Sequence, residues 1–372
     1  MNPKLTKSFT EDNTYNFTLT NINVSLANSL RRIILSEIPT TVFKAEDITL
    51  NNCKIVANTS RLHNEIIKQR LCCIPIHIKN TDELPNKYIL EIDVENDTDN
   101  IAYITTEHFK IKNKANENYM TEDEVHKIFP KNVITQSYID FVRLRPRIAD
   151  SIPGERLKLS CEFSVGTAKE NSMYNVVSKC AYSNTIDPKA VDDEWEKRKQ
   201  KYAKEGTLDE AEIEYEKKNF YILDAQRHFV PDSFDFVIES VGVYENKYII
   251  KNACKILQNK FVDFIQNIDS NTIPIHASNT MMENAFDIVL ENEDYTMGKV
   301  LEYLLFALYY DVTDQKNKIL LYCGFLKEHP HDTDSIIRVQ LPTEYDKTTV
   351  KQTLRDVAIV ANDIYKKLYT MF

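Results

Sequence analysis

The sequence predicts an α+β protein made of two related units, each combining a sheet with long helices. Stretches in which large apolar and polar residues alternate, as in half-buried strands, lie between segments whose apolar residues recur every three or four positions, as in helices. The order strand, helix, strands and long apolar-striped helix occurs twice, the first time with a large insertion. Because neither stripe can bury itself, we expect the two long helices to pair.

Composition limits the possible functions. The 372 residues contain 46 Lys and Arg against 56 Asp and Glu, a net charge of −10 that disfavours a protein whose task is to coat nucleic acid. Only 6 glycines are present and neither GxGxxG nor GxxxxGK[ST] occurs, so a phosphate-cradling loop is not expected. The first residues lack the apolar segment of a signal peptide, and no apolar run reaches the ~20 residues of a membrane helix. We therefore expect a soluble intracellular protein with no membrane partner.

The seven cysteines are scattered through the chain without a CxxC pair. We expect free, mostly buried thiols in a reducing compartment, and no thiolate zinc site. They are Cys53, Cys72, Cys73, Cys161, Cys180, Cys254 and Cys323.

A strand over residues 15–20 precedes a predicted helix within residues 21–39. Its apolar residues form one wide face, Asn23 is placed to cap the first turn, and Pro39 prevents continuation. The polar side carries Asn28, Arg31 and Arg32, which are suited to a partner surface. A plain surface helix with solvated arginines is the alternative.

The middle of the chain predicts a mixture of short elements. Residues 58–71 read as a capped helix whose apolar positions are Leu62, Ile66 and Leu71. Strand-like alternation occurs in residues 41–55, 88–94, 101–105 and 157–165. Residues 187–219 are dense in both charges and predict one or two solvated helices or a mobile arm, in which Trp195 either anchors a partner or covers its own helix.

Two long apolar stripes dominate the C-terminal part. After a strand over 234–241, residues 248–268 carry Ile250, Ala253, Leu257, Phe261, Phe264 and Ile268 at helical spacing. A second unit then predicts strands at 285–290, 319–325 and 335–340, and a helix over 296–308 with Leu301, Leu304, Leu305 and Leu308 on one face. The last helix carries a coiled-coil-like seam of Val350, Leu354, Val357, Ala361, Ile364 and Leu368.

Two sets of motifs resemble the alpha-like subunits of multisubunit RNA polymerases. VSLANSLRRIILSEIPT and NTSRLHNEIIKQRLCCIPI, within residues 24–76, are similar to the larger alpha-like subunit, which is subunit 3 of eukaryotic RNA polymerase II or the D-type subunit of archaea. Residues 236–268 resemble its second dimerisation segment. EDYTMGKVL from Glu293, then Gly324-Phe325, His329-Pro-His331 and IRVQ from Ile337, resemble the smaller partner, which is subunit 11 or the L-type subunit of archaea. A fusion of this kind is similar to that of large cytoplasmic DNA viruses.

The resemblance implies an α+β fold of two alpha-like dimerisation units fused in one chain, the first interrupted by an inserted mainly-β domain. The implied domains are a subunit-3-like domain over 1–50 and 176–270, with the charged arm at about 187–219, an inserted domain over 51–175, and a subunit-11-like domain over 278–372. The halves would pair through the two stripes above. Residues 74–160 contain no cysteine, so the zinc or iron–sulfur ligands of some family members are missing and no cofactor is expected.

The implied function is non-catalytic assembly of a DNA-directed RNA polymerase. The platform would bind the second-largest subunit, with Asn28, Arg31 and Arg32 facing that subunit and Glu293, Asp294 and Thr296 at the equivalent helix of the second half. The largest subunit and small subunits of the subunit 10/12 type are the other implied partners, and DNA and RNA would be reached only through the complex. The implied location is a cytoplasmic viral factory or virion for a viral chain, and otherwise the nucleus.

Other functions stay open on the sequence alone. His63 near Glu65, or His329 with His331, are candidates for acid–base or metal chemistry, but no nucleophile with an orienting group accompanies them and His-Pro-His should hold its rings apart. The arginines of FVRLRPR (Arg143, Arg145 and Arg147) suggest a nucleic-acid binder, which the net charge opposes. A scaffold subunit of another complex would show the same sequence features and differ only in its partners. The two halves could also pair by exchange between two chains.

Overall fold

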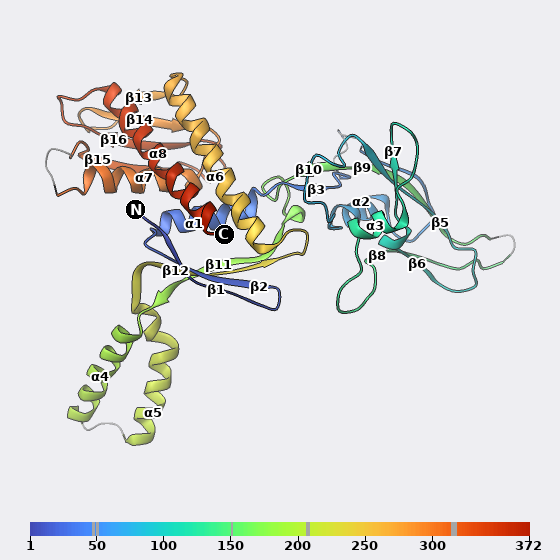
Figure 1. The fold of residues 1–372 in the computed structure, drawn as a ribbon, viewed down its shortest axis with the longest axis horizontal. Helices are drawn as coiled ribbons and strands as arrows, with labels where there is room; N and C mark the ends of the chain where they lie inside the picture. The colour runs from blue at the N-terminus through green and yellow to red at the C-terminus, as the bar shows by residue number, and fades with distance from the viewer. Residues whose placement is uncertain (47–48, 50–51, 150–151, 206–208, 314–317) are drawn as a thin grey trace. The chain divides into compact units, whose positions relative to one another are not determined.

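The computed structural model describes residues 1–46, 49, 52–149, 152–205, 209–313 and 318–372 (Figure 1). The chain forms two compact units. The first unit comprises Met1–Ile33, Lys179–Glu239 and Asn246–Phe372, and the second comprises Ile34–Ser178 and Ser240–Glu245. Helices and antiparallel sheets occur in both, which confirms the predicted α+β class.

The first unit contains two four-stranded sheets with the same topology. One sheet has the order β1-β2-β12-β11 and the other has the order β13-β14-β16-β15. In each repeat a helix follows the second strand and a long helix follows the fourth. The elements of the first repeat are β1 (Lys4–Glu11), β2 (Thr14–Thr20), α1 (Val24–Ser36), β11 (Val177–Ile186), β12 (Phe229–Ser240) and α6 (Asn246–Asp269). Those of the second are β13 (Ile275–Ala277), β14 (Ala285–Leu290), α7 (Tyr295–Leu305), β15 (Tyr322–Leu326), β16 (Ser335–Gln340) and α8 (Lys347–Met371).

Apolar alternation explains why these strands form. In β2 the side chains of Tyr15, Phe17 and Leu19 are buried. Phe17 lies opposite Phe236 of β12, and their rings stack with centroids 4.9 Å apart. The long helices α6 and α8 lie side by side over the sheets (Figure 1). Burial of these apolar faces supplies the main stabilisation of the unit.

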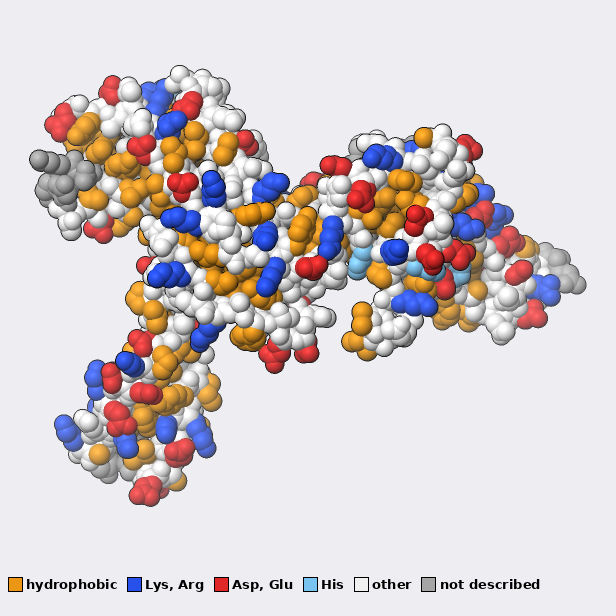
Figure 2. Space-filling view, in the orientation of Figure 1, with side chains coloured by type: hydrophobic (Ala, Val, Ile, Leu, Met, Phe, Trp, Pro, Cys, Tyr) orange, Lys and Arg blue, Asp and Glu red, His pale blue; other side chains and the backbone are white. Residues whose placement is uncertain are grey.

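The charged segment of the first unit forms a helical hairpin, α4 (Pro188–Glu205) and α5 (Glu210–Asn219), inserted between β11 and β12. Basic and acidic side chains are interspersed over its surface (Figure 2). Asp187 N–H donates to the main-chain oxygen of His228 at 3.0 Å, which closes the base of the hairpin. Helices were one of the predicted outcomes for this segment.

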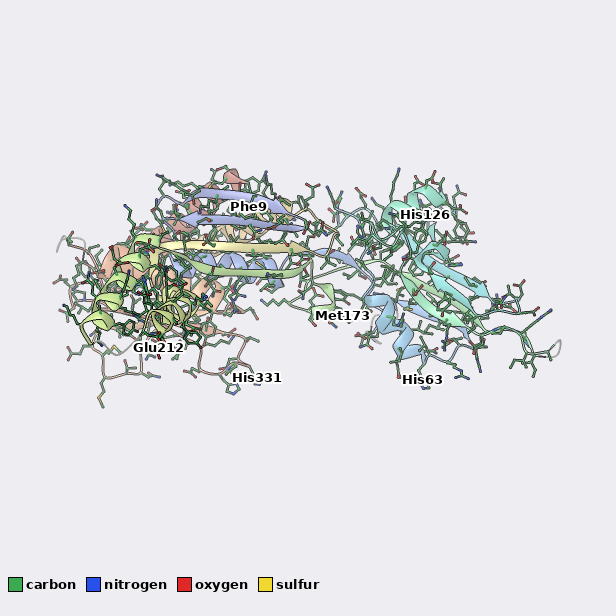
Figure 3. The ribbon with its side chains drawn as sticks, turned by 90° about the horizontal axis from the view of Figure 1, so that it is seen from below. Phe9, His63, His126, Met173, Glu212 and His331 are labelled. Atoms are coloured by element: carbon green, nitrogen blue, oxygen red, sulfur yellow. The ribbon has the colours of Figure 1, made fainter. Side chains whose placement is uncertain are left out.

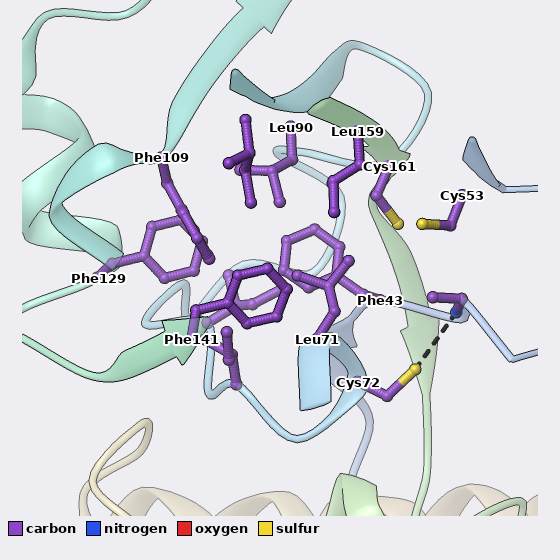
Figure 4. Close-up of a cluster of buried hydrophobic side chains, with 14 of the residues drawn as sticks. Phe43, Cys53, Leu71, Cys72, Leu90, Phe109, Phe129, Phe141, Leu159 and Cys161 are labelled. Atoms are coloured by element: carbon purple, nitrogen blue, oxygen red, sulfur yellow. Dashed lines mark hydrogen bonds between the residues drawn. The ribbon is translucent and has the colours of Figure 1, made fainter. Parts of the chain in front are cut away.

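The second unit is built around a sheet of order β4-β9-β5-β7, with two smaller sheets, β10-β3 and β6-β8. Its strands and helices are β3 (Thr40–Val42), β4 (Cys53–Asn58), α2 (Asn64–Cys72), β5 (Tyr88–Glu95), β6 (Ala102–Thr105), β7 (Lys110–Asn113), α3 (Glu122–Ile128), β8 (Asp140–Leu144), β9 (Arg156–Glu162) and β10 (Ser164–Gly166). Phe43, Phe109, Phe129 and Phe141 meet in its core (Figure 4). Phe109 is edge-on to both Phe129 and Phe141, at centroid distances of 5.2 and 5.7 Å.

Several predicted boundaries were wrong. The helix expected over 58–71 begins only at Asn64, because Asn58 instead accepts hydrogen bonds from Ser60 in a turn. Ile67 rather than Ile66 is buried, because it lies four residues before the buried Leu71 and so shares its helix face. The strand expected over 157–165 is interrupted at Phe163, after which β10 pairs with β3 instead of β4.

The helix expected over 296–308 also differs. It passes into a π-helical turn at Phe306–Tyr310, and the changed geometry leaves Leu308 exposed instead of on the apolar face. None of the helices in the described part of the chain is long and apolar enough to cross a membrane.

Candidate functional site

Helix α1 buries one face and offers another. Its first turn is capped as predicted, since Asn23 Oδ1 accepts from the N–H of Ser25 at 2.9 Å. Leu26, Leu30 and Ile33 are completely buried. Asn28, Arg31 and Arg32 are half-buried, so their polar ends reach the surface. The helix is therefore fixed on its apolar side and polar on its accessible side.

Arg32 joins the two repeats of the first unit. Its Nη2 atom lies 2.6 Å from Asp294 Oδ2, and its Nε donates to Thr296 Oγ1 at 2.8 Å. The partners lie 262 and 264 positions further along the chain, at the N-terminus of α7. Three of the six residues predicted for the large-subunit surface thus contact one another across the repeats.

Asp294 also caps α7. Its Oδ1 accepts from the N–H of Thr296 at 2.8 Å. Burial disfavours the charged carboxylate, but the hydrogen bonds from Thr296 and the neighbouring Arg32 outweigh that effect and lower the pKa of Asp294. The carboxylate is therefore held ionised where it serves both the helix end and the arginine.

The other predicted surface residues make different contacts. Arg31 Nε donates to Asn28 Oδ1 at 3.1 Å on the same helix. Burial raises the pKa of Cys180 on β11 to about 12, and the charge of Arg31 partly offsets the rise, which places Arg31 near that strand. Glu293 instead accepts from Lys260 of α6, with Nζ 3.0 Å from Oε1.

The predicted stripes lie on α6 and α8, which contact each other. Every predicted position is buried, and Phe264 and Ile268 retain 8% and 6% exposure near one end of α6. Phe261 stacks on Tyr365 with ring centroids 5.9 Å apart. Gln258 Nε2 also donates to the main-chain oxygen of Tyr365 at 3.4 Å. The two helices thus share an apolar surface with polar contacts at intervals.

Tyr365 is a residue that the sequence reasoning missed. Its side chain is completely buried, and its hydroxyl lies 2.5 Å from Ser29 Oγ on α1. It follows Val357 and Ala361 at four-residue steps, so the helical period was the available signal. This polar pair ties α8 to α1 and gives the buried Tyr365 hydroxyl a partner, while Ser29 Oγ also donates to the main-chain oxygen of Leu26 at 2.8 Å.

Trp195 is buried within its own hairpin. It packs with Phe220 at a centroid distance of 5.6 Å, together with Val191 and Ala225. Arg198 lies over the Phe220 ring and pairs with Asp224 at 2.7 Å. Of the two predicted roles for Trp195, covering its own helix is the one that this packing matches.

Neither histidine group forms a catalytic or metal cluster in the described residues. No group of three or more His, Cys, Asp or Glu side chains there could hold a metal ion. His329 and His331 are exposed, and the side chain of His331 projects from a loop (Figure 3). The expectation that His-Pro-His keeps its rings apart was wrong, because the centroids are 5.1 Å apart and the His331 N–H donates to His329 Nδ1.

Two cysteines meet across neighbouring strands, which the sequence did not indicate. Cys53 of β4 is directly opposite Cys161 of β9, and their sulfur atoms face each other (Figure 4). Their hydrogen bond lowers the pKa of Cys53 and raises that of Cys161. Six of the seven cysteines are buried or half-buried and all are free, whereas Cys73 is exposed.

Comparisons with known proteins agree on one family. The family described as the RNA polymerase Rpb3/Rpb11 dimerisation domain matches residues 16–261, more than half of the chain. The chain is 26% identical over 295 residues to DNA-directed RNA polymerase II subunit RPB3 of Schizosaccharomyces pombe, covering 73% of this chain and 90% of that protein. It is 26% identical over 280 residues to DNA-directed RNA polymerase subunit Rpo3 of Pyrococcus horikoshii, covering 70% of this chain and 95% of that protein.

A further relative is the Conjugation stage-specific protein of Tetrahymena thermophila. The chain is 29% identical to it over 202 residues, which is 51% of this chain and 62% of that protein, so the match spans less than two thirds of that relative. The family match covers most of β2, all of α1, β11 and β12, and most of α6, which belong to the first repeat, together with the second unit between them. The chain therefore belongs to the RNA polymerase Rpb3/Rpb11 dimerisation domain family.

Proposed function

We propose that this chain is a non-catalytic assembly subunit of a multisubunit DNA-directed RNA polymerase, in which one polypeptide supplies both partners of an alpha-like heterodimer. The repeated topology of the first unit carries the proposal, since both repeats place equivalent helices on sheets of the same strand order. The matching relatives named as polymerase subunits supply the context. The α6–α8 contact would take the place of the subunit interface.

The proposed docking surface for the second-largest subunit is the polar side of α1. Arg31 is the central residue of this proposed surface. Its one described side-chain hydrogen bond is to Asn28, so its guanidinium group keeps further N–H donors for a partner. We assign Arg32, Asp294 and Thr296 a supporting role, since they already bind one another. Glu293 would orient Lys260 beside them.

The remaining partners follow from the family. We propose contacts with the largest subunit and with small subunits of the subunit 10/12 type, and access to DNA and RNA only through the complex. The fusion is similar to the arrangement in large cytoplasmic DNA viruses, which supports a viral source and action in the cytoplasmic factory or virion. We propose no metal or cofactor for this chain.

Affinity purification of the tagged chain from its native source tests this function. We expect two very large chains in stoichiometric amounts and nucleotide-polymerising activity in the eluate. Arg31→Ala should reduce recovery of the second-largest subunit at least about fivefold, because a charged hydrogen bond is worth about 1.5–3 kcal/mol. Lys366→Ala, which removes an exposed cation from α8, is the matched control.

Two outcomes would count against the proposal. An unrelated set of partners without polymerase chains would leave only the alpha-like fold and favour a scaffold of another complex. Recovery of the large subunits by folded Arg31→Ala at the level of the Lys366→Ala control would remove α1 from the docking surface. Circular dichroism of both variants would show whether a loss reflects unfolding.

A further inference from the structure

The second unit contains a cavity of about 370 Å³ that the proposed assembly role does not use. It lies between the turn that leads into α2 and the edge of β8. Four arginines line it: Arg61, Arg70, Arg143 and Arg145. These guanidinium groups gather in one hollow although the chain as a whole carries a net charge of −10.

Two of these arginines hold the cavity in shape. Arg70 donates from Nε to the main-chain oxygen of Phe141 at 2.7 Å and from Nη2 to that of Asp140 at 2.9 Å. Arg145 pairs with the buried carboxylate of Glu155, and the main-chain N–H of Arg145 donates to the same carboxylate at 2.7 Å. The guanidinium groups of Arg70 and Arg145 therefore already have partners, one at each end of β8.

The other two arginines are available. The side chains of Arg61 and Arg143 are exposed. Within the residues that the structure describes, neither forms an ion pair. Each therefore presents a complete set of donors toward the cavity mouth, with a geometry that fits a carboxylate.

The main chain of Arg143 also faces the cavity. Among the strands that the structure describes, β8 pairs with β6 along one edge. Phe141 and Arg145 direct main-chain groups to the opposite edge, where they meet Arg70 and Glu155. The register of β8 with β6 is regular from Val142 to Leu144, so main-chain groups alternate between the edges there, and we infer that the N–H and C=O of Arg143, two residues before Arg145, point to this edge as well. The β8 edge thus offers the N–H of Arg143 as a donor and its C=O as an acceptor, between the positions where Arg70 and Glu155 already bind the strand.

Apolar side chains complete the lining. Leu62 and Val142 form part of the wall, and the exposed ring of Tyr103 lies at the side. Glu155 also lines the cavity, but its carboxylate is already paired with Arg145. A cavity of this size accepts one or two side chains together with a short extended main chain.

We propose that this cavity binds an extended segment of a partner protein in which acidic and apolar side chains alternate. The main chain of the segment pairs with Arg143 at the β8 edge, as in strand addition. Its carboxylates bind Arg61 and Arg143, and its apolar side chain packs against Leu62 and Val142. All of these residues belong to the second unit, so the site is separate from the α1 surface.

Fluorescence anisotropy of the full chain with a labelled peptide of six alternating Glu and Leu residues tests this site. Replacing both arginines, Arg61→Glu with Arg143→Glu, should weaken binding about tenfold or more, because two charged hydrogen-bonding groups are lost. The matched control Lys54→Glu reverses an exposed charge on β4, outside the cavity, and should change the affinity less than about twofold. Arg143→Lys should fall between them, because a lysine keeps the charge but loses the fork.

Three results would overturn the proposal. Absence of peptide binding by the folded wild-type chain would remove the site, and equal losses in the cavity variant and in Lys54→Glu would show non-specific attraction. Tighter binding of a six-nucleotide oligo-dT, lost in the same arginine variants, would show that the cavity serves nucleic acid instead. Circular dichroism, together with the milder pair Arg61→Ala and Arg143→Ala, would separate loss of binding from loss of fold.

Discussion

Asp294 combines a helix cap with an ion pair, and its titration can be followed. Hydrogen bonds from Thr296 and Arg32 lower its pKa despite burial. A carboxyl whose pKa is lower in the folded state stabilises the fold above its unfolded pKa of about 4, and this stabilisation is lost as the pH falls through the folded value. The contribution is therefore complete at neutral pH and disappears in acid.

Asp294→Asn should make the stability of the chain less sensitive to acid. Urea unfolding at a series of pH values from about 6 to 2 should show a smaller fall in the free energy of unfolding than in the wild type. Asn still caps the helix, so α7 should form. Asp263→Asn, at an exposed position of α6, is the control, and an equal flattening there would contradict the role of Asp294.

Gly298 permits close packing inside α7. A Cβ at this position would lie 2.0 Å from Cε2 of the Phe325 ring on β15. Alanine favours a helix over glycine by about 1 kcal/mol, but an overlap of this size in a packed site costs about 1–3 kcal/mol. The steric effect should therefore prevail.

Gly298→Ala should lower the free energy of unfolding by up to about 2 kcal/mol in urea titrations, as the balance of these two effects. Adding Phe325→Leu, which removes the ring, should recover part of the loss through a favourable coupling between the two sites. An alanine variant more stable than the wild type would show that the α7–β15 contact is looser than described.

At the scale of elements, the pairing of α6 with α8 is the main packing interaction of the long helices. Leu257 and Leu354 are completely buried. Leu257→Ala should destabilise the chain by about 2–5 kcal/mol, because a buried leucine leaves a cavity. Val262→Ala on the same helix, at a side chain that is 38% exposed, should cost far less. Equal losses in thermal or urea unfolding would mean that the stripe is not a buried seam.

The α4–α5 hairpin has its own small core and a closed base. Trp195, Phe220 and their neighbours form a buried cluster within this segment, and the Asp187 N–H donates to the main-chain oxygen of His228 where the hairpin leaves the sheet. Replacing residues 188–227 by a short Gly-Ser turn should change the melting temperature of the remaining chain by no more than a few degrees. Loss of cooperative unfolding in that variant would show that the hairpin is part of the main core.

The regular helices could be predicted from sequence because their cause is local. The stripes on α6 and α8 follow from apolar spacing alone. Asn23 was identified as the cap of α1 because it stands just before the apolar spacing of that helix begins. Contacts and strand pairings between residues far apart in the sequence could not be predicted in this way. Nothing near Arg32 indicates Asp294, and nothing near Phe163 indicates that the chain changes its partner strand.

The individual residues of the candidate site could therefore be predicted from the sequence, but the contacts between them could not. The resemblance selected Arg32, Asp294 and Thr296 separately, whereas the fold brings them into one cluster. Cys53 and Cys161 meet for the same reason, because strand register depends on the whole sheet. Tyr365 lay within a recognised period, but only its contact with Ser29 shows what its hydroxyl does.

At the scale of the whole molecule, the same strand order and the same placement of helices occur twice in the first unit. Each four-stranded sheet is followed by a long helix, and the two long helices cover one another. The apolar stripes of both long helices are buried within this one chain. This removes the concentration dependence that an ordinary dimer interface would impose.

Sedimentation equilibrium of the purified chain tests this central claim most directly. The account predicts a single species of 43.3 kDa whose mass does not change with dilution, because α6 and α8 pair within one polypeptide. Leu354→Ala should keep that mass while lowering stability. A species of twice the mass that dissociates on dilution together with loss of helix would show that the halves exchange between chains, and it would contradict the account.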